Sequence, residues 1–259
     1  MQIYKVQLRK IFSRADVRIS LSMFFVIPIV IAFLISIRSG IIEIEGSTFA
    51  GVQYAVMVTG LLKSLLLVGV VTLLIGTSTV AREIDTGLDC VYFTRVRKRE
   101  SVFVSKLFAM DLVITAMFMV LLVSSIAGWL FFLRGTEFGT PFFVADNADD
   151  VKRVIFAFLR SYLEILALSK LFLFVSVLYK YNQAIVMNLL LLVGIKLLSN
   201  VVFLQQWMPT YIGDSLELFQ YAGMDVVVQG LRGMLLLLIY ALFFGVAGIW
   251  IYQKSDLVR

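Results

Sequence analysis

Six long apolar runs, separated by short polar connections, dominate the pattern of hydrophobic and polar positions. They span about residues 19–37, 54–80, 107–133, 154–178, 184–204 and 233–252. Each is close to the ~20 apolar residues that an α-helix needs to cross a hydrocarbon core of ~30 Å. The pattern predicts an all-α integral membrane protein, with one domain of six transmembrane helices over residues 19–252.

In residues 1–18 the apolar residues do not form one continuous run but recur at the spacing of a helical face. Tyr4, Leu8, Ile11, Phe12 and Ala15 recur on one helical face, and basic residues occupy much of the remainder. Such a segment is typical of a helix that lies in the membrane interface, with its apolar face at the acyl boundary. We expect an N-terminal interfacial amphipathic helix over residues 1–18. The alternative is an ordinary basic flank of the first span.

The amino-acid composition excludes several kinds of catalytic and metal-binding site. The chain is 61% apolar and only 15% charged, with one cysteine and no histidine. A lone cysteine cannot form an internal disulfide. The absence of histidine removes imidazole catalysis and the usual imidazole metal sites. We therefore expect no catalytic residue, no metal site and no enzyme activity in this chain.

Basic residues set the expected orientation. Of 23 lysines and arginines, 14 fall in the N-terminal segment, the 81–106 and 179–183 connections and the tail, and five fall in the other connections. Because basic residues collect on the cytosolic side, we expect a multi-pass protein of the cell membrane with both termini in the cytosol, including a tail at 253–259. The net charge of +6 follows this topology and does not indicate a nucleic-acid partner.

Motifs for an internal energy source are missing. The sequence holds no G-x-x-x-x-G-K-[ST] phosphate loop, and it holds neither H-E-x-x-H nor G-x-S-x-G. The chain thus has no visible nucleotide site. If it transports actively, the energy must come from outside this chain.

Charged residues also occur inside the apolar runs. Each costs roughly 2.5–3.5 kcal/mol at mid-bilayer on insertion scales, so each should pair or face water. Arg160, Ser161 and Glu164 share one helical face, and Arg160 and Glu164 are four residues apart. This intramembrane polar stripe predicts either a substrate or gating surface or structural charge pairing. In the second case Arg160 pairs with Glu164, and Lys63 or Lys196 is a further partner.

The connection at 81–106 is the longest one on the basic side. It begins with both charge signs, at Arg82, Glu83 and Asp85, and Thr86-Gly87 suits a turn or cap. Leu88 adds an apolar anchor. The pattern favours a surface that docks on a partner; the alternative is a solvated loop that binds anionic lipid.

The same stretch resembles the permeases of ABC type-2 exporters. Members carry a Glu four residues before a Gly-Thr, then Ser-Arg-Pro-x-x-Arg, then Gly-Lys-Leu at the start of the third helix. The matching positions are Glu83 and Gly87, then Thr94, Arg95 and Arg99, then Lys106 and Leu107. Leu88, Val96 and Ser105 depart from the pattern.

The resemblance implies a translocation subunit that works with a second permease, the same or a different chain, and with separate nucleotide-binding ATPase subunits. ATP and Mg would be bound by those partners, and this chain would bind no cofactor. The implied ATPase-coupling loop contains Arg82, Glu83, Asp85, Thr86, Gly87, Leu88, Arg95 and Arg99. Export is the implied direction, with peptides or other amphipathic compounds as the favoured substrates.

The connection at 205–232 is rich in aromatic residues. Asp214 or Ser215 suits the start of a short helix, and Gly223 suits its end. In the resembled family this position holds short re-entrant helices, whereas an aromatic interface belt is the simpler interpretation.

Two other classes of function stay open. One is a self-contained channel or secondary carrier that uses the polar stripe as its path. The other is a membrane scaffold without transport. A permease should co-purify with an ATPase, and a channel or carrier should not.

Overall fold

The computed structural model describes residues 2–37, 49–88, 99–144, 147–214, 218 and 221–254. These residues form helices and connections, and six of the helices are long and apolar enough to cross a membrane. The predicted all-α membrane fold is therefore confirmed. Arg95 lies outside the described residues.

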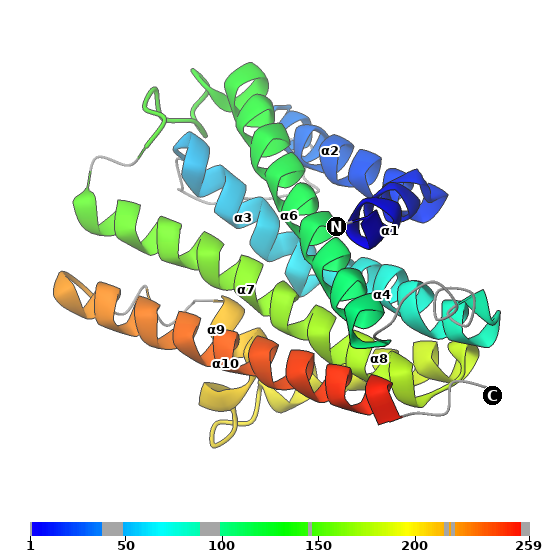
Figure 1. The fold of residues 1–259 in the computed structure, drawn as a ribbon. Coiled ribbons are helices and arrows are strands. Elements are labelled where there is room, and N and C mark those ends of the chain that lie inside the picture. Colours follow the sequence, from blue (N-terminus) through cyan, green and yellow to red (C-terminus); the bar gives the residue numbers. More distant parts are fainter. Residues whose placement is uncertain are drawn as a thin grey trace.

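The helices are packed side by side along the bundle (Figure 1). Their bounds are α1 Gln2–Ser13, α2 Ala15–Ser36, α3 Gly51–Ser64, α4 Leu67–Asp85, α6 Arg99–Gly128, α7 Ala148–Leu178, α8 Tyr181–Leu198, α9 Pro209–Asp214 and α10 Met224–Lys254. A π-helical turn η1 (Trp129–Leu133) extends α6, and a 3-10 turn η2 (Gln205–Trp207) lies between α8 and α9.

Helix α7 is the centre of the bundle. It contacts α3, α4, α6, α8, α9 and α10, and α10 runs along its length. In the 18-residue apolar stretch that could cross the membrane, 72% of α7 is buried inside the protein, against 17% for α8 and 11% for α10. A helix that is enclosed by others can carry polar groups that lipid would not accept. The polar stripe of the sequence lies on this helix.

The second apolar run is two helices and not one. Helix α3 ends at Ser64 and α4 begins at Leu67, and Leu66 between them has a left-handed backbone with φ 57°. A leucine in that conformation costs about 1–2 kcal/mol, so its surroundings must hold it there. The break separates a half-helix, α3, from the rest of the span.

The N-terminal segment is also divided. Helix α1 ends at Ser13, five residues before the predicted bound, and Arg14 has an extended backbone before α2 begins. Ile11 is buried, and the ring of Tyr4 packs edge-to-face on Phe108 of α6, whereas Phe12 stays exposed. Only part of the predicted apolar face is therefore left for lipid.

Two further helices begin or end at residues other than those that the apolar runs predicted. Helix α8 ends at Leu198, and α10 begins at Met224, where the sequence predicted a loop. The apolar piece from 224 to 231 is the first part of α10. Gly223, with φ 61°, precedes that helix and does not end α9.

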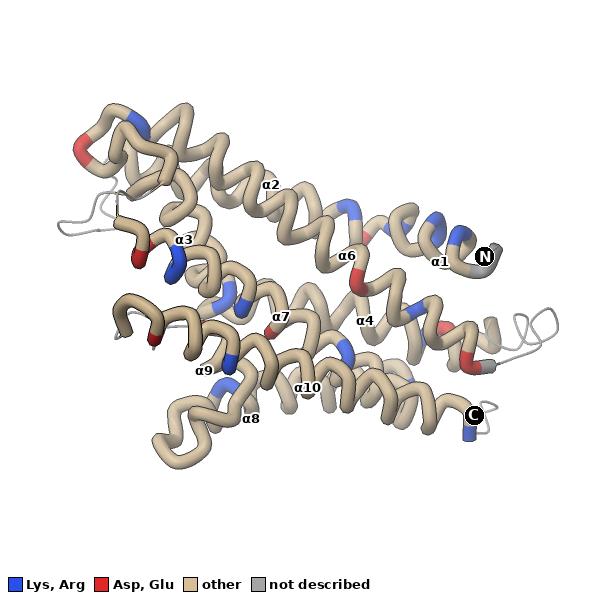
Figure 2. The backbone as a smooth tube through the Cα atoms, turned by 60° about the vertical axis from the view of Figure 1, so that its left-hand side comes forward, with Lys and Arg blue, Asp and Glu red and all other residues tan. Residues whose placement is uncertain are grey.

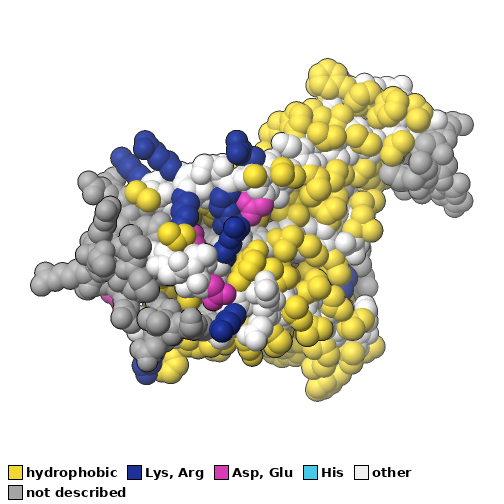
Figure 3. Space-filling view, turned by 90° about the vertical axis from the view of Figure 1, so that its right-hand side faces the viewer, with side chains coloured by type: hydrophobic (Ala, Val, Ile, Leu, Met, Phe, Trp, Pro, Cys, Tyr) yellow, Lys and Arg dark blue, Asp and Glu magenta, His cyan; other side chains and the backbone are white. Residues whose placement is uncertain are grey.

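The N-terminal helix and the end of α10 lie at the same end of the bundle (Figure 2). We call this the basic end; it comprises α1, the last turn of α4 and the last turn of α10. Seen from there, lysine and arginine side chains gather on one part of the surface, and hydrophobic side chains cover the neighbouring flank (Figure 3).

Candidate functional site

Four charged side chains from four helices meet beside the break between α3 and α4. We call them the four-charge cluster: Lys63 (α3), Glu164 (α7), Lys196 (α8) and Asp214 (α9). Lys63 Nζ lies 2.5 Å from Glu164 Oε2 and 3.4 Å from Asp214 Oδ1. Lys196 Nζ donates a hydrogen bond of 2.9 Å to Asp214 Oδ2. Two positive and two negative charges balance.

Ser161 and Gly213 complete the contacts of the cluster. Lys63 Nζ donates to Ser161 Oγ over 3.1 Å, and Ser161 Oγ donates to the carbonyl of Gly213 over 3.1 Å. A Cβ on Gly213 would stand 1.9 Å from Glu164 Oε2. A glycine is therefore required where α9 meets α7, and α9 is held against the buried charges.

The predicted pair of Arg160 with Glu164 is wrong. Among the described residues, the ion pair of Glu164 is with Lys63, which the sequence offered only as a further partner. Arg160 is buried on the side of α7 that faces α10, where a Cβ on Gly233 would stand 2.3 Å from its Nε. The three residues of the polar stripe are all buried, but they serve two different interfaces.

Asp214 is the member of the cluster that sequence reasoning missed. The sequence pattern suits Asp214 to the start of a short helix, whereas in the structure it is the last residue of α9. The available signal was an acid in an aromatic, apolar connection, where it needs a cation. Lys196, in a span, needed an acid for the same reason.

A cavity of about 390 Å³ lies between α3 and α7 and reaches the cluster. Its walls are mostly apolar, and its floor is formed by Lys63, Ser161 and Asp214. The remaining lining residues are Phe49, Gln53, Val56, Met57, Gly60, Asp150, Val154 and Ala157. An apolar cavity with a few convergent polar groups is the usual form of a ligand site.

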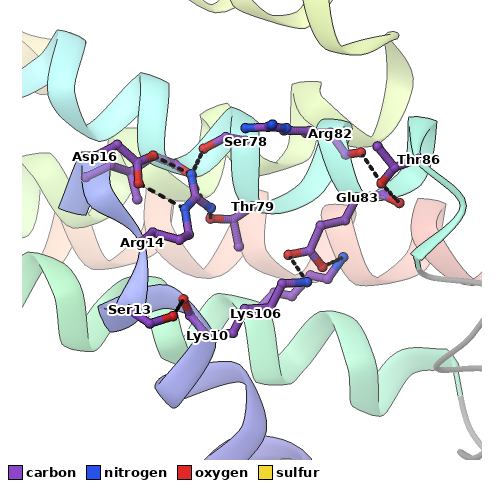
Figure 4. Close-up of polar contacts among 11 residues, drawn as sticks. Lys10, Ser13, Arg14, Asp16, Ser78, Thr79, Arg82, Glu83, Thr86 and Lys106 are labelled. Carbon is purple, nitrogen blue, oxygen red and sulfur yellow. Dashed lines mark hydrogen bonds and ion pairs between the residues drawn. The ribbon is translucent and has the colours of Figure 1, made fainter. Parts of the chain in front are cut away.

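A second cluster fixes the basic end (Figure 4). The carboxylate of Glu83 lies 2.8 Å from Lys10 Nζ of α1 and 3.2 Å from Lys106 Nζ of α6. Glu83 and Lys106 are buried, so the pairing is shielded from water. The base of the connection after α4 is thereby tied to two neighbouring helices.

Arg14 makes a parallel link from the α1–α2 junction. Its guanidinium donates to Asp16, to Thr79 over 3.0 Å and to Ser78 (Figure 4). Because Ser78 and Thr79 lie on α4, one arginine fixes the bend between α1 and α2 against that helix.

The residues of the predicted coupling loop therefore divide into two sets. Glu83 points into the protein, so the expectation that it contacts a partner does not agree with its position here. Arg82, Asp85, Thr86 and Leu88 are exposed. Asp85 accepts a bond of 2.7 Å from the backbone N–H of Tyr181, so it also anchors the start of α8.

Gly87 and Thr86 end α4 as the sequence predicted. Gly87 has φ 69°, and its N–H donates to the carbonyl of Ile84 over 3.0 Å. Thr86 Oγ1 donates to the carbonyl of Arg82 over 2.8 Å. This is a glycine-terminated helix end, in which carbonyls of the last turn are satisfied locally. Arg99 is the first residue of α6.

No protein-family model matches the chain, and no curated protein matches it. Within the described part of the chain, no group of three or more acidic or cysteine side chains is placed to hold a metal ion. The fold and the two clusters define a multi-pass α-helical membrane protein with buried charges beside an apolar cavity.

Proposed function

We propose that this chain is the permease subunit of an ABC transporter. It moves substrate across the cell membrane while separate nucleotide-binding subunits bind ATP and Mg and hydrolyse the nucleotide. A second permease, the same or a different chain, completes the pathway. Export of peptides or other amphipathic compounds is the direction and the class that the resemblance favours.

The observation that carries the proposal is the construction of the basic end. Arg82, in the last turn of α4, and Leu88, just after that helix, are exposed, and both belong to the stretch that resembles the coupling element. Glu83, next to them, is fixed to α1 and α6 by Lys10 and Lys106. A contact that transmits movement must be attached firmly to the helices that it moves, and the pairing of Glu83 with Lys10 and Lys106 supports such a role.

Two other observations support transport by a partner-driven subunit. Charges inside a membrane protein face the bundle interior or a water-filled cavity and often mark substrate or ion pathways, and the four-charge cluster adjoins a cavity. The sequence also has no phosphate loop, so if transport is driven by ATP, the nucleotide has to be hydrolysed on another chain.

The test is purification of the tagged chain from its own membranes, with identification of the subunits that accompany it. We expect an ATPase to co-purify with the wild-type chain. The double variant Arg82→Glu, Leu88→Glu should lose it, because both side chains are exposed and neither supports the fold. Lys5→Glu, also exposed at the basic end, is the matched control. An ATPase that stays with the double variant would contradict the assigned contact.

A second candidate is a self-contained secondary carrier or channel. The broken helix favours it, because half-helices beside charged groups are common where carriers bind ions or substrates. Proteoliposomes that contain this chain alone decide between the two. Substrate movement driven by an ion gradient, without ATP, would favour the carrier and refute the ABC permease.

A further inference from the structure

The floor of the cavity between α3 and α7 has its hydrogen-bond donors already engaged. Lys63 carries three N–H groups, and its ammonium meets Glu164, Ser161 and Asp214. Ser161 gives its own proton to the carbonyl of Gly213. A ligand that needs donors from this floor would have to displace a carboxylate from a buried lysine.

The carboxylate of Asp214, by contrast, can still accept a further hydrogen bond. Its carboxylate has about four lone-pair sites and meets two cations. Oδ1 is the more loosely held oxygen, at 3.4 Å from Lys63, whose closer partner at 2.5 Å is Glu164. About 22% of the Asp214 side chain is exposed, against 3% for Lys63. A ligand thus meets a carboxylate oxygen at the end of an apolar cavity.

We propose that this cavity binds an amphipathic primary amine. The ammonium group of the ligand contacts Asp214 Oδ1, and its apolar part lies between α3 and α7, along Met57 and Val154. Lys63 stays with Glu164 when the ligand takes its place at Asp214, so Glu164 keeps its cation. The ligand adds one positive charge to a balanced cluster, at the one carboxylate of the cluster whose side chain is 22% exposed. The inference names the substrate class of the proposed transporter and, in that respect, rests on the proposed function.

An anionic ligand fits the same cavity less well. It would approach Asp214 and, at the other end of the cavity, Asp150, whose carboxylate already pairs with Arg153 at 2.7 Å. It would also have to draw Lys63 away from Glu164, which is buried and would be left without its ion pair. Breaking such a pair typically costs about 3–5 kcal/mol.

The test uses monodansylcadaverine, a fluorescent primary amine, with its N-acetyl derivative as the neutral control. Both are titrated into the wild-type protein in nanodiscs, and protein-free nanodiscs give the lipid background. We expect saturable binding of the amine and no saturable binding of the acetylated probe. Because a charge-assisted contact is lost, Asp214→Asn should weaken binding by about 10- to 100-fold. Asp225→Asn, an exposed acid in the first turn of α10, should bind as the wild type does.

Gly60→Leu provides a variant that leaves the cluster intact. Gly60 lines the cavity, and a Cβ there meets no atom within 4 Å, so the leucine should fill the cavity without strain. It should reduce binding of the amine while Tm is retained. Equal binding of the acetylated probe, or unchanged binding in both Asp214→Asn and Gly60→Leu, would overturn the inference.

The binding measurement needs neither ATP nor a partner, so it is separable from the proposed function. Specific amine binding without a co-purifying ATPase would leave the site in place and argue against the ABC permease. A co-purifying ATPase with no amine binding would leave the ABC permease in place and refute the substrate class.

Discussion

Glu164→Leu tests the pairing in the centre of the membrane domain. The variant leaves Lys63, whose side chain is 3% exposed, with only Ser161 and the more distant carboxylate of Asp214. Breaking a buried pair costs about 3–5 kcal/mol, and the remaining contact at 3.4 Å places the expected loss near the lower bound. For a chain of 259 residues we expect Tm to fall by roughly 6–12 °C.

A double-mutant cycle identifies the partner. In Lys63→Met, Glu164→Leu both charges are gone and Asp214 keeps Lys196 at 2.9 Å, so most of the lost stability should return. The coupling energy between positions 63 and 164 should be about 2 kcal/mol or more, and that between Arg160→Met and Glu164→Leu should be smaller. Thermal unfolding in nanodiscs, followed by tryptophan fluorescence, gives all the values. A larger coupling with Arg160 would refute the assignment.

Three further outcomes follow from the same contacts. Gly213→Ala should lower stability by about 1–3 kcal/mol in thermal unfolding, because its Cβ would strike Glu164, whereas Gly194→Ala meets nothing within 4 Å and should not. Glu83→Gln should cost about 2 kcal/mol in the same assay, with Lys106 buried beside it; a stable variant would argue against the buried pair. In a chain without its native cysteine, Ala148→Cys should react with an impermeant thiol reagent in intact cells; failure to react would reverse the proposed topology.

The spans were predictable because length and apolarity alone decide them, whereas the break at Leu66 was not. Three consecutive leucines, from 65 to 67, carry no glycine or proline that would signal an interruption. Next to the interruption, Lys63 at the end of α3 makes tertiary contacts with α7 and α9, and a local sequence pattern does not contain such contacts. The end of α8 and the start of α10 differ from the predicted bounds for a related reason, since apolar residues continue across both boundaries.

The sequence predicted which charged residues are buried at the site, but it did not predict which of them form ion pairs with one another. Spacing correctly placed Arg160 and Glu164 inside the protein, but proximity on one helix does not decide which neighbour supplies the opposite charge. Lys63 approaches from another helix at a better distance. At the basic end, the motif containing Glu83 suggested a contact with a partner, whereas packing turns its carboxylate inward to Lys106.

The long separation between Lys63 and its partners has a consequence for biogenesis. Its contacts in the cluster lie 98 or more residues further along the chain, on α7 and α9. When α3 and α4 leave the ribosome, that lysine faces an insertion cost of roughly 2.5–3.5 kcal/mol at mid-bilayer, because neither of its partner acids, Glu164 and Asp214, has been synthesised. Helix α3 should therefore wait at the translocon or the lipid interface until α7 emerges. A broken span, whose first half can enter later than the second, suits that delayed assembly.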